Sequence, residues 1–316
     1  MMMLLFMLSL DKITYAAGYI PNIQFAPFYV AIEKGYYEDE GIELKMDYTI
    51  GPDVLKLVAL GKIQLGSTDP DAFLNAVERG IPLVHVATLY QTYPVALITK
   101  DQVEKSADLK GKRIGISGAY GSSYLALRAL LNQLNLKLSD IDLRTIGYTQ
   151  VATMKKGLMD GVMGYENHEP VLLESEGMPV NTLQLNQQSL WPGVGIMTSE
   201  TFFKENPLLV QRFLKATFRG VDDLLKNPEA CFQLVVETYF PQVKQSDRMQ
   251  IEKRVLMKTL PYFQSEYTVK KGLGQCDPDR WSNLHQLMVK EKMIPDSNAW
   301  KSRINREFMF ATTPEE

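Results

Sequence analysis

Cysteine and histidine are scarce in this chain, which has two cysteines and three histidines among 316 residues. Cys231 and Cys276 lie far apart and form no CxxC motif, so the sequence leaves open whether they pair or remain free. Such a small number of soft ligands leaves little material for a zinc-type site. We therefore predict neither a metal nor a cofactor.

The chain also lacks a large excess of charge of either sign, since 34 Lys and Arg stand against 37 Asp and Glu. No basic stripe is present that would neutralise phosphates, which argues against a nucleic-acid partner. The remaining composition, 45% apolar and 22% charged, is that of an ordinary globular protein. The length allows two domains of usual size or one large α/β domain.

A long hydrophobic run is missing as well. The first ten residues, MMMLLFMLSL, are apolar and uncharged, but a bilayer-spanning helix needs about 20 such residues. A secretory leader would add a basic region and a small-residue cleavage site. We interpret residues 1–10 as a leader remnant or a misassigned start, with an apolar tail as the alternative. No lipid-attachment cysteine follows that would indicate an anchor.

From residue 11 onward, short apolar strands alternate with helical periods, as in βαβ units of a largely parallel sheet. KITYAAGYI, IELKMDYTI and KIQLGST are typical strands of a first run, and DLKGKRIGIS opens a second. After the strand GVGIMTS the chain is almost wholly helical. The pattern predicts an α/β protein with a helical C-terminal extension.

Two passages share one order of elements. VALGKIQLGSTDPDAF and MKKGLMDGVMGYENHEP each read as helix, glycine, strand, polar loop and helix. The polar loops, 67–69 and 165–167, thereby follow the C-terminal ends of strands, where open α/β sheets bind ligands. We predict two lobes whose loops face each other across a cleft.

The run ITYAAGYI breaks at Pro21 and presents Asn22, Gln24 and Phe25 just before a helix. Proline ends a strand because it has no N–H to donate. Asn22 offers both a donor and an acceptor, which suits the edge of a heteroaromatic ring. It is equally suited to cap the following helix, and the two roles are compatible.

Aromatic side chains are concentrated at the predicted loop ends. A flat ligand stacked on such rings gains about 0.5–1.5 kcal/mol per pair beyond area burial. Most tyrosines of an α/β protein are packing residues, so we favour those that end a strand on the predicted cleft side. The favoured ligand contacts are Tyr90, Tyr120, Tyr148, Tyr165 and Trp191.

Polar residues complete the predicted site. Ser122 and Ser123 begin a helix, where they either cap it or help it to hold an acidic or carbonyl group. Ser67 and Asp69 on one lobe face Glu169 on the other, and carboxylates suit the N–H donors of a ring. For a glutamate at a helix start, simple solvation is the alternative.

The most specific stretch is GYIPNIQFAPFYVAIEKGYYEDEGIEL, residues 18–44, supported by ADLKGKRIGI, GSSYLALRALL and DGVMGYENHEP. From about residue 12 to 240 the chain resembles the solute-binding proteins of ABC importers, a family that fungal thiamine-pyrimidine synthases also resemble. GYIPNIQFAPFYVA and LYQTYPVALI look closest to its riboflavin-binding branch, and the thiamine-precursor branch is the near neighbour. Asn167 and Glu169 match the family's Asn-x-Glu motif.

This resemblance implies a type II periplasmic-binding-protein fold with two Rossmann-like lobes. Lobe one would comprise residues 11–100 and 191–316, and lobe two residues 101–190, with crossings near 99–105 and 184–192. The protein would act outside the cytoplasmic membrane, capture riboflavin or a thiamine pyrimidine precursor, and deliver it to an ABC permease and ATPase.

Two other classes were weighed. The resembling synthases carry a cysteine-rich run after the second crossing, whereas this chain has PGVGIMTS, without cysteine. We therefore predict no enzyme and no catalytic residue. A sensory ligand-binding domain is the third class, but no helix-turn-helix, kinase or transmembrane segment shares the sequence.

Overall fold

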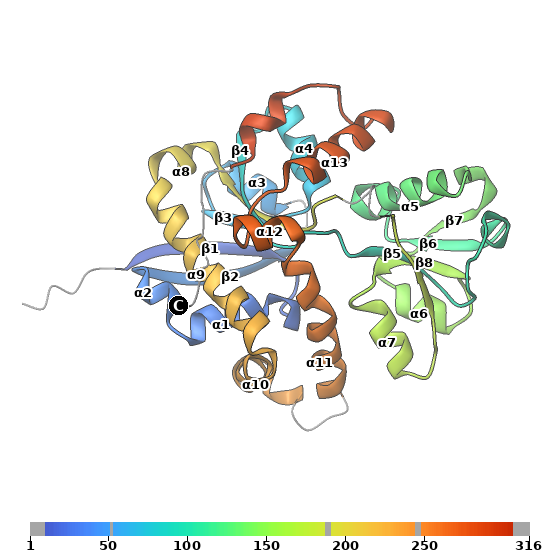
Figure 1. Cartoon of the computed structure of the whole chain (residues 1–316), viewed down its shortest axis with the longest axis horizontal. Helices are drawn as coiled ribbons and strands as arrows, with labels where there is room; N and C mark the ends of the chain where they lie inside the picture. The colour runs from blue at the N-terminus through green and yellow to red at the C-terminus, as the bar shows by residue number, and fades with distance from the viewer. Residues whose placement is uncertain (1–9, 51–52, 187–190, 244–247, 306–316) are drawn as a thin grey trace, which may run out of the picture.

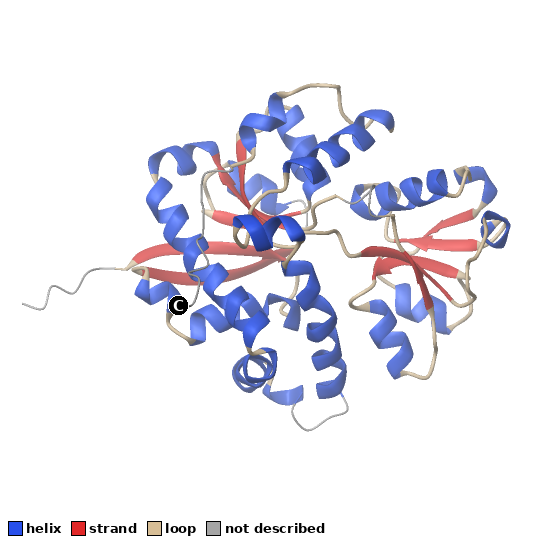
Figure 2. Cartoon of the chain, in the orientation of Figure 1, coloured by secondary structure: helices blue, strands red, loops and turns tan. Residues whose placement is uncertain are grey.

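Two lobes, each built on a five-stranded mixed sheet covered by helices, form the molecule (Figure 1). The computed structural model describes residues 10–50, 53–186, 191–243 and 248–305. Strands lie inside both lobes and helices outside them (Figure 2), so the predicted α/β architecture is confirmed. Residues 1–9 lie outside the described ranges, and the leader interpretation stays a prediction.

The first sheet has the order β2-β1-β3-β10-β4, in which β1 pairs in parallel with β2 and β3. The late strand β10 runs antiparallel between β3 and β4, so the chain returns to the first lobe after building the second. The strands of this sheet are β1 (Asp11–Gly18), β2 (Ile42–Ile50), β3 (Leu65–Thr68), β4 (Leu83–Thr88) and β10 (Gly195–Ser199).

The second sheet has the order β7-β6-β8-β5-β9, in which β6 is parallel to β7 and β8. β5 is antiparallel to β8 and also pairs with β9. The strands of this sheet are β5 (Val95–Thr99), β6 (Arg113–Ile116), β7 (Asp142–Thr145), β8 (Gly161–Tyr165) and β9 (Asn181–Leu183).

The pairing of β5 shifts the first crossing between the lobes. The sequence placed this crossing near residues 99–105, but β5 belongs to the second sheet, so the chain crosses at residues 89–94. Residues 95–99 are all buried. An apolar run of this kind is compatible with a central strand of either sheet, so the sequence alone does not indicate which sheet it joins. The return crossing lies between β9 and β10, and residues 187–190 within it are outside the described part.

Helices cover both sheets. Those of the first lobe are α1 (Ala26–Glu33), α2 (Tyr36–Asp39), α3 (Asp53–Ala59), α4 (Pro70–Glu78), α8 (Glu200–Glu205), α9 (Pro207–Lys226), α10 (Pro228–Tyr239), α11 (Arg248–Thr259), α12 (Glu266–Lys271) and α13 (Pro278–Lys290). Those of the second lobe are α5 (Gly121–Gln133), α6 (Gln150–Lys155) and α7 (Glu169–Ser175). Within the described ranges, no helix combines the length and apolar character that crossing a membrane requires.

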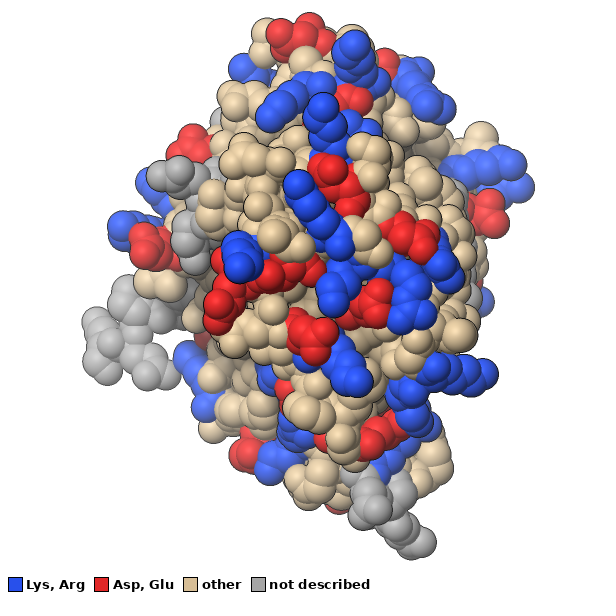
Figure 3. Space-filling model, turned by 90° about the vertical axis from the view of Figure 1, so that its right-hand side faces the viewer, with Lys and Arg blue, Asp and Glu red and all other residues tan. Residues whose placement is uncertain are grey.

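Short 3₁₀ helices join several of these elements. They are η1 (Ile23–Phe25), η2 (Ser106–Leu109), η3 (Leu138–Asp140), η5 (Pro241–Val243), η6 (Leu260–Phe263) and η7 (Ala299–Arg303). Both cysteines are buried and they form no disulfide with each other, which answers the question that their spacing left open. Acidic and basic side chains are interspersed on the face of lobe two that Figure 3 shows.

The C-terminal extension contacts the second lobe, and two of the contacts are ion pairs. Arg254 of α11 pairs with Glu174 of α7, and Arg128 of α5 pairs with Glu291 at the end of α13. Glu291 is the more consequential partner because its side chain is only 5% exposed. A carboxylate removed from water in this way needs its guanidinium partner. The extension therefore holds the lobes together as well as covering lobe one.

Helix α9 packs against α1 at a point where only glycine fits. A Cβ on Gly220 would overlap the carbonyl oxygen of Pro27 and crowd Ala31. Nearby, Phe213 of the same helix packs on Tyr15 of β1, with ring centroids 5.7 Å apart. The close approach thus sets the distance between α9 and the first lobe's core.

We expect Gly220→Ala to lower the free energy of unfolding by about 1–2 kcal/mol, because overpacking outweighs the higher helix propensity of alanine. Urea unfolding followed by circular dichroism measures the difference. Gln211→Ala, at an exposed position of the same helix, is the control and should change stability by less than about 0.5 kcal/mol. A Gly220→Ala protein as stable as the unmodified chain would contradict the packing described here.

Candidate functional site

The two lobes meet at the helices that follow β3 and β6. Asp71, in the first turn of α4, accepts a hydrogen bond from the hydroxyl of Ser122, in the first turn of α5. Each residue is only 4% exposed. The start of α4, just after the predicted loop 67–69, is therefore in direct contact with the start of α5.

A pair of acidic side chains lies at this contact. Burial raises the pKa of the Asp69 carboxyl to about 7, and the neighbouring charge of Asp71 adds to the effect. Burial also raises the pKa of Asp71, although its hydrogen bond with Ser122 opposes the shift. A ligand N–H group placed here would favour the ionised form of the pair. The sequence identified Asp69 but missed Asp71, which reads as an ordinary first-turn acid.

Two buried tyrosines lie beside the acidic pair. The hydroxyl groups of Tyr93, in the first crossing, and Tyr165, at the end of β8, are 3.1 Å apart. Burial raises the pKa of both hydroxyls, and the charge of Asp69 raises each further. Tyr93 and Tyr165 therefore line the bottom of the contact between the lobes, close to Asp69.

Three other tyrosines are exposed at strand ends. Tyr19 follows β1, Tyr120 follows β6 and Tyr148 follows β7, with exposed fractions of 45%, 72% and 77%. β6 and β7 are parallel neighbours, so Tyr120 and Tyr148 emerge at the same edge of the second sheet. Gly118 leaves room for the Tyr120 ring, because a Cβ there would overlap it.

The hydroxyl of Tyr19 in lobe one is influenced by charged groups of lobe two. Burial raises the pKa of its hydroxyl, and Glu169 and Tyr148 of lobe two raise it further. These three groups are therefore neighbours across the cleft. Glu169 is also held in place, since it accepts a 2.8 Å hydrogen bond from the backbone N–H of Tyr165. The exposed rings of Tyr19 and Tyr148 thus lie close together between the lobes.

Other predicted residues have local partners. Asn22 accepts a 2.8 Å hydrogen bond from the N–H of Gln24 and donates to the carbonyl of Ile20, so the capping role is confirmed. The amide nitrogen of Gln24 is buried without a partner in the described part of the chain. The hydroxyl of Ser67 lies 2.6 Å from that of Tyr15.

The remaining predicted residues lie mainly in packed surroundings. Tyr90 is 5% exposed and packs on Phe263, with centroids 5.3 Å apart. Phe25 packs against Tyr48, and Ser123 is half-buried in the first turn of α5. Asn167 is fully buried, and its amide donates to the hydroxyl of Thr259 on α11, 2.8 Å away. Asn167 therefore joins lobe two to the C-terminal extension.

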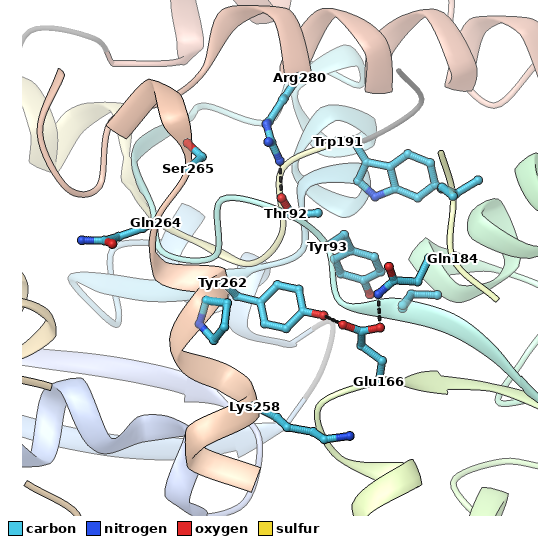
Figure 4. A pocket seen from close by; sticks show the side chains of 13 residues that line it. Thr92, Tyr93, Glu166, Gln184, Trp191, Lys258, Tyr262, Gln264, Ser265 and Arg280 are labelled. Atoms are coloured by element: carbon cyan, nitrogen blue, oxygen red, sulfur yellow. Dashed lines mark hydrogen bonds between the residues drawn. The ribbon is translucent and has the colours of Figure 1, made fainter. Parts of the chain in front are cut away.

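Trp191 lines a separate cavity of about 330 Å³ beside the two crossings (Figure 4). Glu166 contributes from lobe two, where it accepts hydrogen bonds from Gln184 and from the Tyr262 hydroxyl. Lys258 and Arg280 contribute from the C-terminal extension. No sequence motif predicted that residues of the extension would line a site, because they lie in helices without a motif.

The three histidines have different surroundings. His85 is fully buried in β4, where burial lowers the pKa of its imidazole to about 3, so it is a packed core residue as predicted. His285 stacks on Trp300. His168 lies beside Glu169, whose hydrogen bond and charge outweigh burial and raise the imidazole pKa. In the ranges that the structure covers, no three acidic, cysteine or histidine side chains form a metal-binding group.

Comparison with known proteins supports the same architecture. The chain is similar to the crystal structure of the periplasmic aliphatic sulphonate binding protein SsuA from Escherichia coli, with a TM-score of 0.71 at 17% identity. The match covers 98% of this chain and 96% of that one. The predicted periplasmic-binding-protein fold is confirmed.

Sequence relatives come from binding proteins and from enzymes. The riboflavin-binding protein RibY of Chloroflexus aurantiacus is 37% identical over 89% of this chain and 81% of its own length. The formylaminopyrimidine-binding protein of Halalkalibacterium halodurans is 24% identical, over 75% and 74% of the two chains. A 4-amino-5-hydroxymethyl-2-methylpyrimidine phosphate synthase of Aspergillus parasiticus is 25% identical, over 81% and 78%.

A family model described as NMT1/THI5 like matches residues 22–231. This range contains the opening motif, both crossings and most of the strand ends described above. Together with the 37% identical relative, it shows that the chain belongs to the NMT1/THI5-like family.

Proposed function

We propose that this protein is the substrate-binding component of an ABC-type vitamin importer and that it captures riboflavin, or a closely related flavin, between its lobes. The observation that carries the proposal is that the exposed Tyr19 of lobe one lies close to the exposed Tyr148 and to Glu169 of lobe two. The 37% identity to a riboflavin-binding protein supports the choice of ligand.

Stacking on these rings accounts for a substantial part of the binding energy. Exposed aromatic rings grouped at a cleft are typical of a surface that a ligand covers. Two stacked pairs contribute about 1–3 kcal/mol beyond area burial, and each hydrogen bond adds about 1 kcal/mol. Area burial of a large flat ring supplies most of the remainder of the roughly 8 kcal/mol that micromolar affinity requires.

Hydrogen bonding to the ring edge would give specificity. Asp69 lies at the junction of the lobes, and its pKa near 7 means that an N–H donor can shift it to the ionised form. The pyrimidine-like edge of a flavin offers such an N–H. The hydrogen bond between Asp71 and Ser122 keeps the starts of α4 and α5 together beside Asp69. The acidic pair thus supplies the acceptor that the ligand's donor needs.

Closure of the lobes follows from the fold. Residues 89–94 and the return crossing are the links about which such lobes move, and a hinged closure around a ligand is a common mechanism. We propose that the protein works outside the cytoplasmic membrane and delivers its ligand to a permease and ATPase. The division into lobes 11–100 with 191–316 and 101–190 stays part of this proposal, with its first boundary shifted to 89–94.

A thiamine pyrimidine precursor is the second candidate. The 24% identical formylaminopyrimidine-binding protein supports it, and an aminopyrimidine also carries N–H donors for Asp69. It is smaller and would contact fewer tyrosines. Catalysis has less support, because the strand after the return crossing, β10, contains no cysteine and is paired on both sides.

The experiment that tests the proposal is a titration of riboflavin with refolded protein, followed by flavin fluorescence. Refolding removes ligand carried over from the host. We expect saturable quenching at micromolar or lower protein concentration, without displacement by formylaminopyrimidine. Calorimetric binding of the pyrimidine without flavin quenching would favour the second candidate, and binding of neither would reject both.

Tyr148→Ala should weaken riboflavin binding about tenfold, because the variant loses one stacked ring and its buried area. Tyr148→Phe keeps the ring and should bind within about twofold of the unmodified protein. Tyr148 is 77% exposed, so neither variant should affect folding. Equal affinities of the alanine and phenylalanine variants would argue against stacking at this position.

Riboflavin binding should strengthen about thirtyfold between pH 5.5 and 8, because Asp69, with a pKa of about 7 in the free protein, must lose its proton to accept the ligand N–H. Asp69→Asn should remove most of this pH dependence, measured by the same fluorescence titration. His168→Gln, which removes the titrating imidazole beside Glu169, is the control and should keep the slope. If riboflavin binding by Asp69→Asn kept the same pH dependence, a group other than Asp69 would be responsible for it.

A further inference from the structure

The cavity at the crossings is separate from the contact between Asp71 and Ser122. Its walls come from four parts of the chain: the first crossing with Thr92 and Tyr93, Glu166 after β8, the return crossing with Gln184 and Trp191, and the extension from Lys258 onward. Figure 4 shows these side chains arranged around one space, with the Tyr262 hydroxyl hydrogen-bonded to Glu166. At about 330 Å³, the cavity lies at the lower end of small-molecule sites.

Aromatic and apolar side chains form much of the wall. Trp191 and Tyr93 stack with centroids 6.4 Å apart and an interplanar angle of 28°. Both are buried, at 2% and 8% exposure, and Tyr262 is exposed by 8%. A flat ring of modest size therefore fits the character of the cavity better than a polar chain.

The hydrogen-bonding groups of the wall are mostly in use. The Glu166 carboxylate accepts from Gln184 and Tyr262, and the Arg280 guanidinium donates to the Gln91 carbonyl and to the Thr92 hydroxyl. Among the lining charges, Arg280 is paired with Asp277, with 3.4 Å between its Nε and a carboxylate oxygen, so the remaining lining cation, Lys258, stands against the carboxylate of Glu166.

Two donors stand apart from this network. The indole N–H of Trp191 is buried and has no partner within the part of the chain that the structure describes. In Figure 4 it lies on the side of the indole nearest Thr92 and Tyr93. The Lys258 ammonium, on the last turn of α11, is exposed and has no ion pair among the described residues. A buried donor left without an acceptor costs about 1–3 kcal/mol.

We propose that this cavity is a second ligand site, distinct from the flavin cleft, and that it binds a small aromatic acid. The ring would lie against Trp191, Tyr93 and Tyr262, and an acceptor on it would receive the indole N–H. The acidic group would pair with the Lys258 ammonium. The ligand class follows from the wall: flat apolar surfaces, a buried indole donor without an acceptor, and the Lys258 ammonium without an ion pair among the described residues.

Occupancy of this site would affect the first one. The walls belong to both lobes and both crossings, so a bound acid favours the arrangement in which Glu166 meets Tyr262. A ligand that binds one arrangement preferentially shifts the equilibrium toward it. If the flavin proposal is right, a saturating acid should raise riboflavin affinity about twofold to fivefold, a usual size for coupling.

Salicylate and its neutral analogue salicylamide provide the test, by calorimetric titration of refolded protein without flavin. We expect one salicylate site, and salicylamide weaker by about fivefold because charge-assisted hydrogen bonds are stronger. Lys258→Gln should weaken salicylate about threefold to tenfold and leave salicylamide unchanged. Lys156→Gln, at the exposed end of α6, is the matched control and should change neither.

Trp191→Phe should weaken both compounds, since it keeps a ring but removes the donor, while Lys258 is exposed and its variant should fold normally. Absence of saturable salicylate binding would overturn the proposal. So would equal losses in Lys258→Gln and Lys156→Gln. Loss of salicylate binding in Tyr148→Ala, with Lys258→Gln unaffected, would place the acid in the flavin cleft and overturn it as well. Because these titrations contain no flavin, they can succeed or fail independently of the proposed function.

Discussion

The buried hydrogen bond between Asp71 and Ser122 joins the lobes at the position on which the remaining site depends. Each residue begins a helix that follows a central strand of its own lobe, so the bond fixes one helix terminus against the other. Asp69 owes its raised pKa to this enclosure and to Asp71. Tyr19 and Tyr148 lie close together because the strand ends that carry them meet at this junction.

Tyr93 contributes both to the contact between the lobes and to the wall of the cavity at the crossings. Its hydroxyl meets that of Tyr165 at 3.1 Å, next to the acidic pair, while its ring stacks on Trp191 in the cavity wall. The residue belongs to the first crossing, so a change in the angle between the lobes moves both groups of contacts together. This shared residue would be the physical basis of the proposed coupling between the two proposed sites.

The alternation of strands and helices and the two polar loops predicted an α/β protein of two lobes, because both depend on local periodicity, whereas the type of fold came from the family resemblance. Tyr120, Tyr148 and Ser122 were predicted from the same pattern; the structure places the two tyrosines after strand ends and Ser122 at the contact between the lobes. The sequence prediction placed β5 in lobe one, whereas it belongs to the sheet of lobe two. All residues of β5 are buried, and such an apolar run does not indicate which strands it pairs with. Tyr90 and Asn167 end strands as predicted, but α11 and η6 return from the C-terminal extension and cover them. Contacts made by such a distant segment leave no signal in the local pattern.

A crystal structure of refolded protein with riboflavin would test the central claim most directly. The account predicts the flavin ring between Tyr19 of lobe one and Tyr148 of lobe two, with an N–H edge within hydrogen-bond distance of Asp69. Flavin density in the cavity at the crossings against Trp191, or on a surface away from all three exposed tyrosines, would contradict this binding mode.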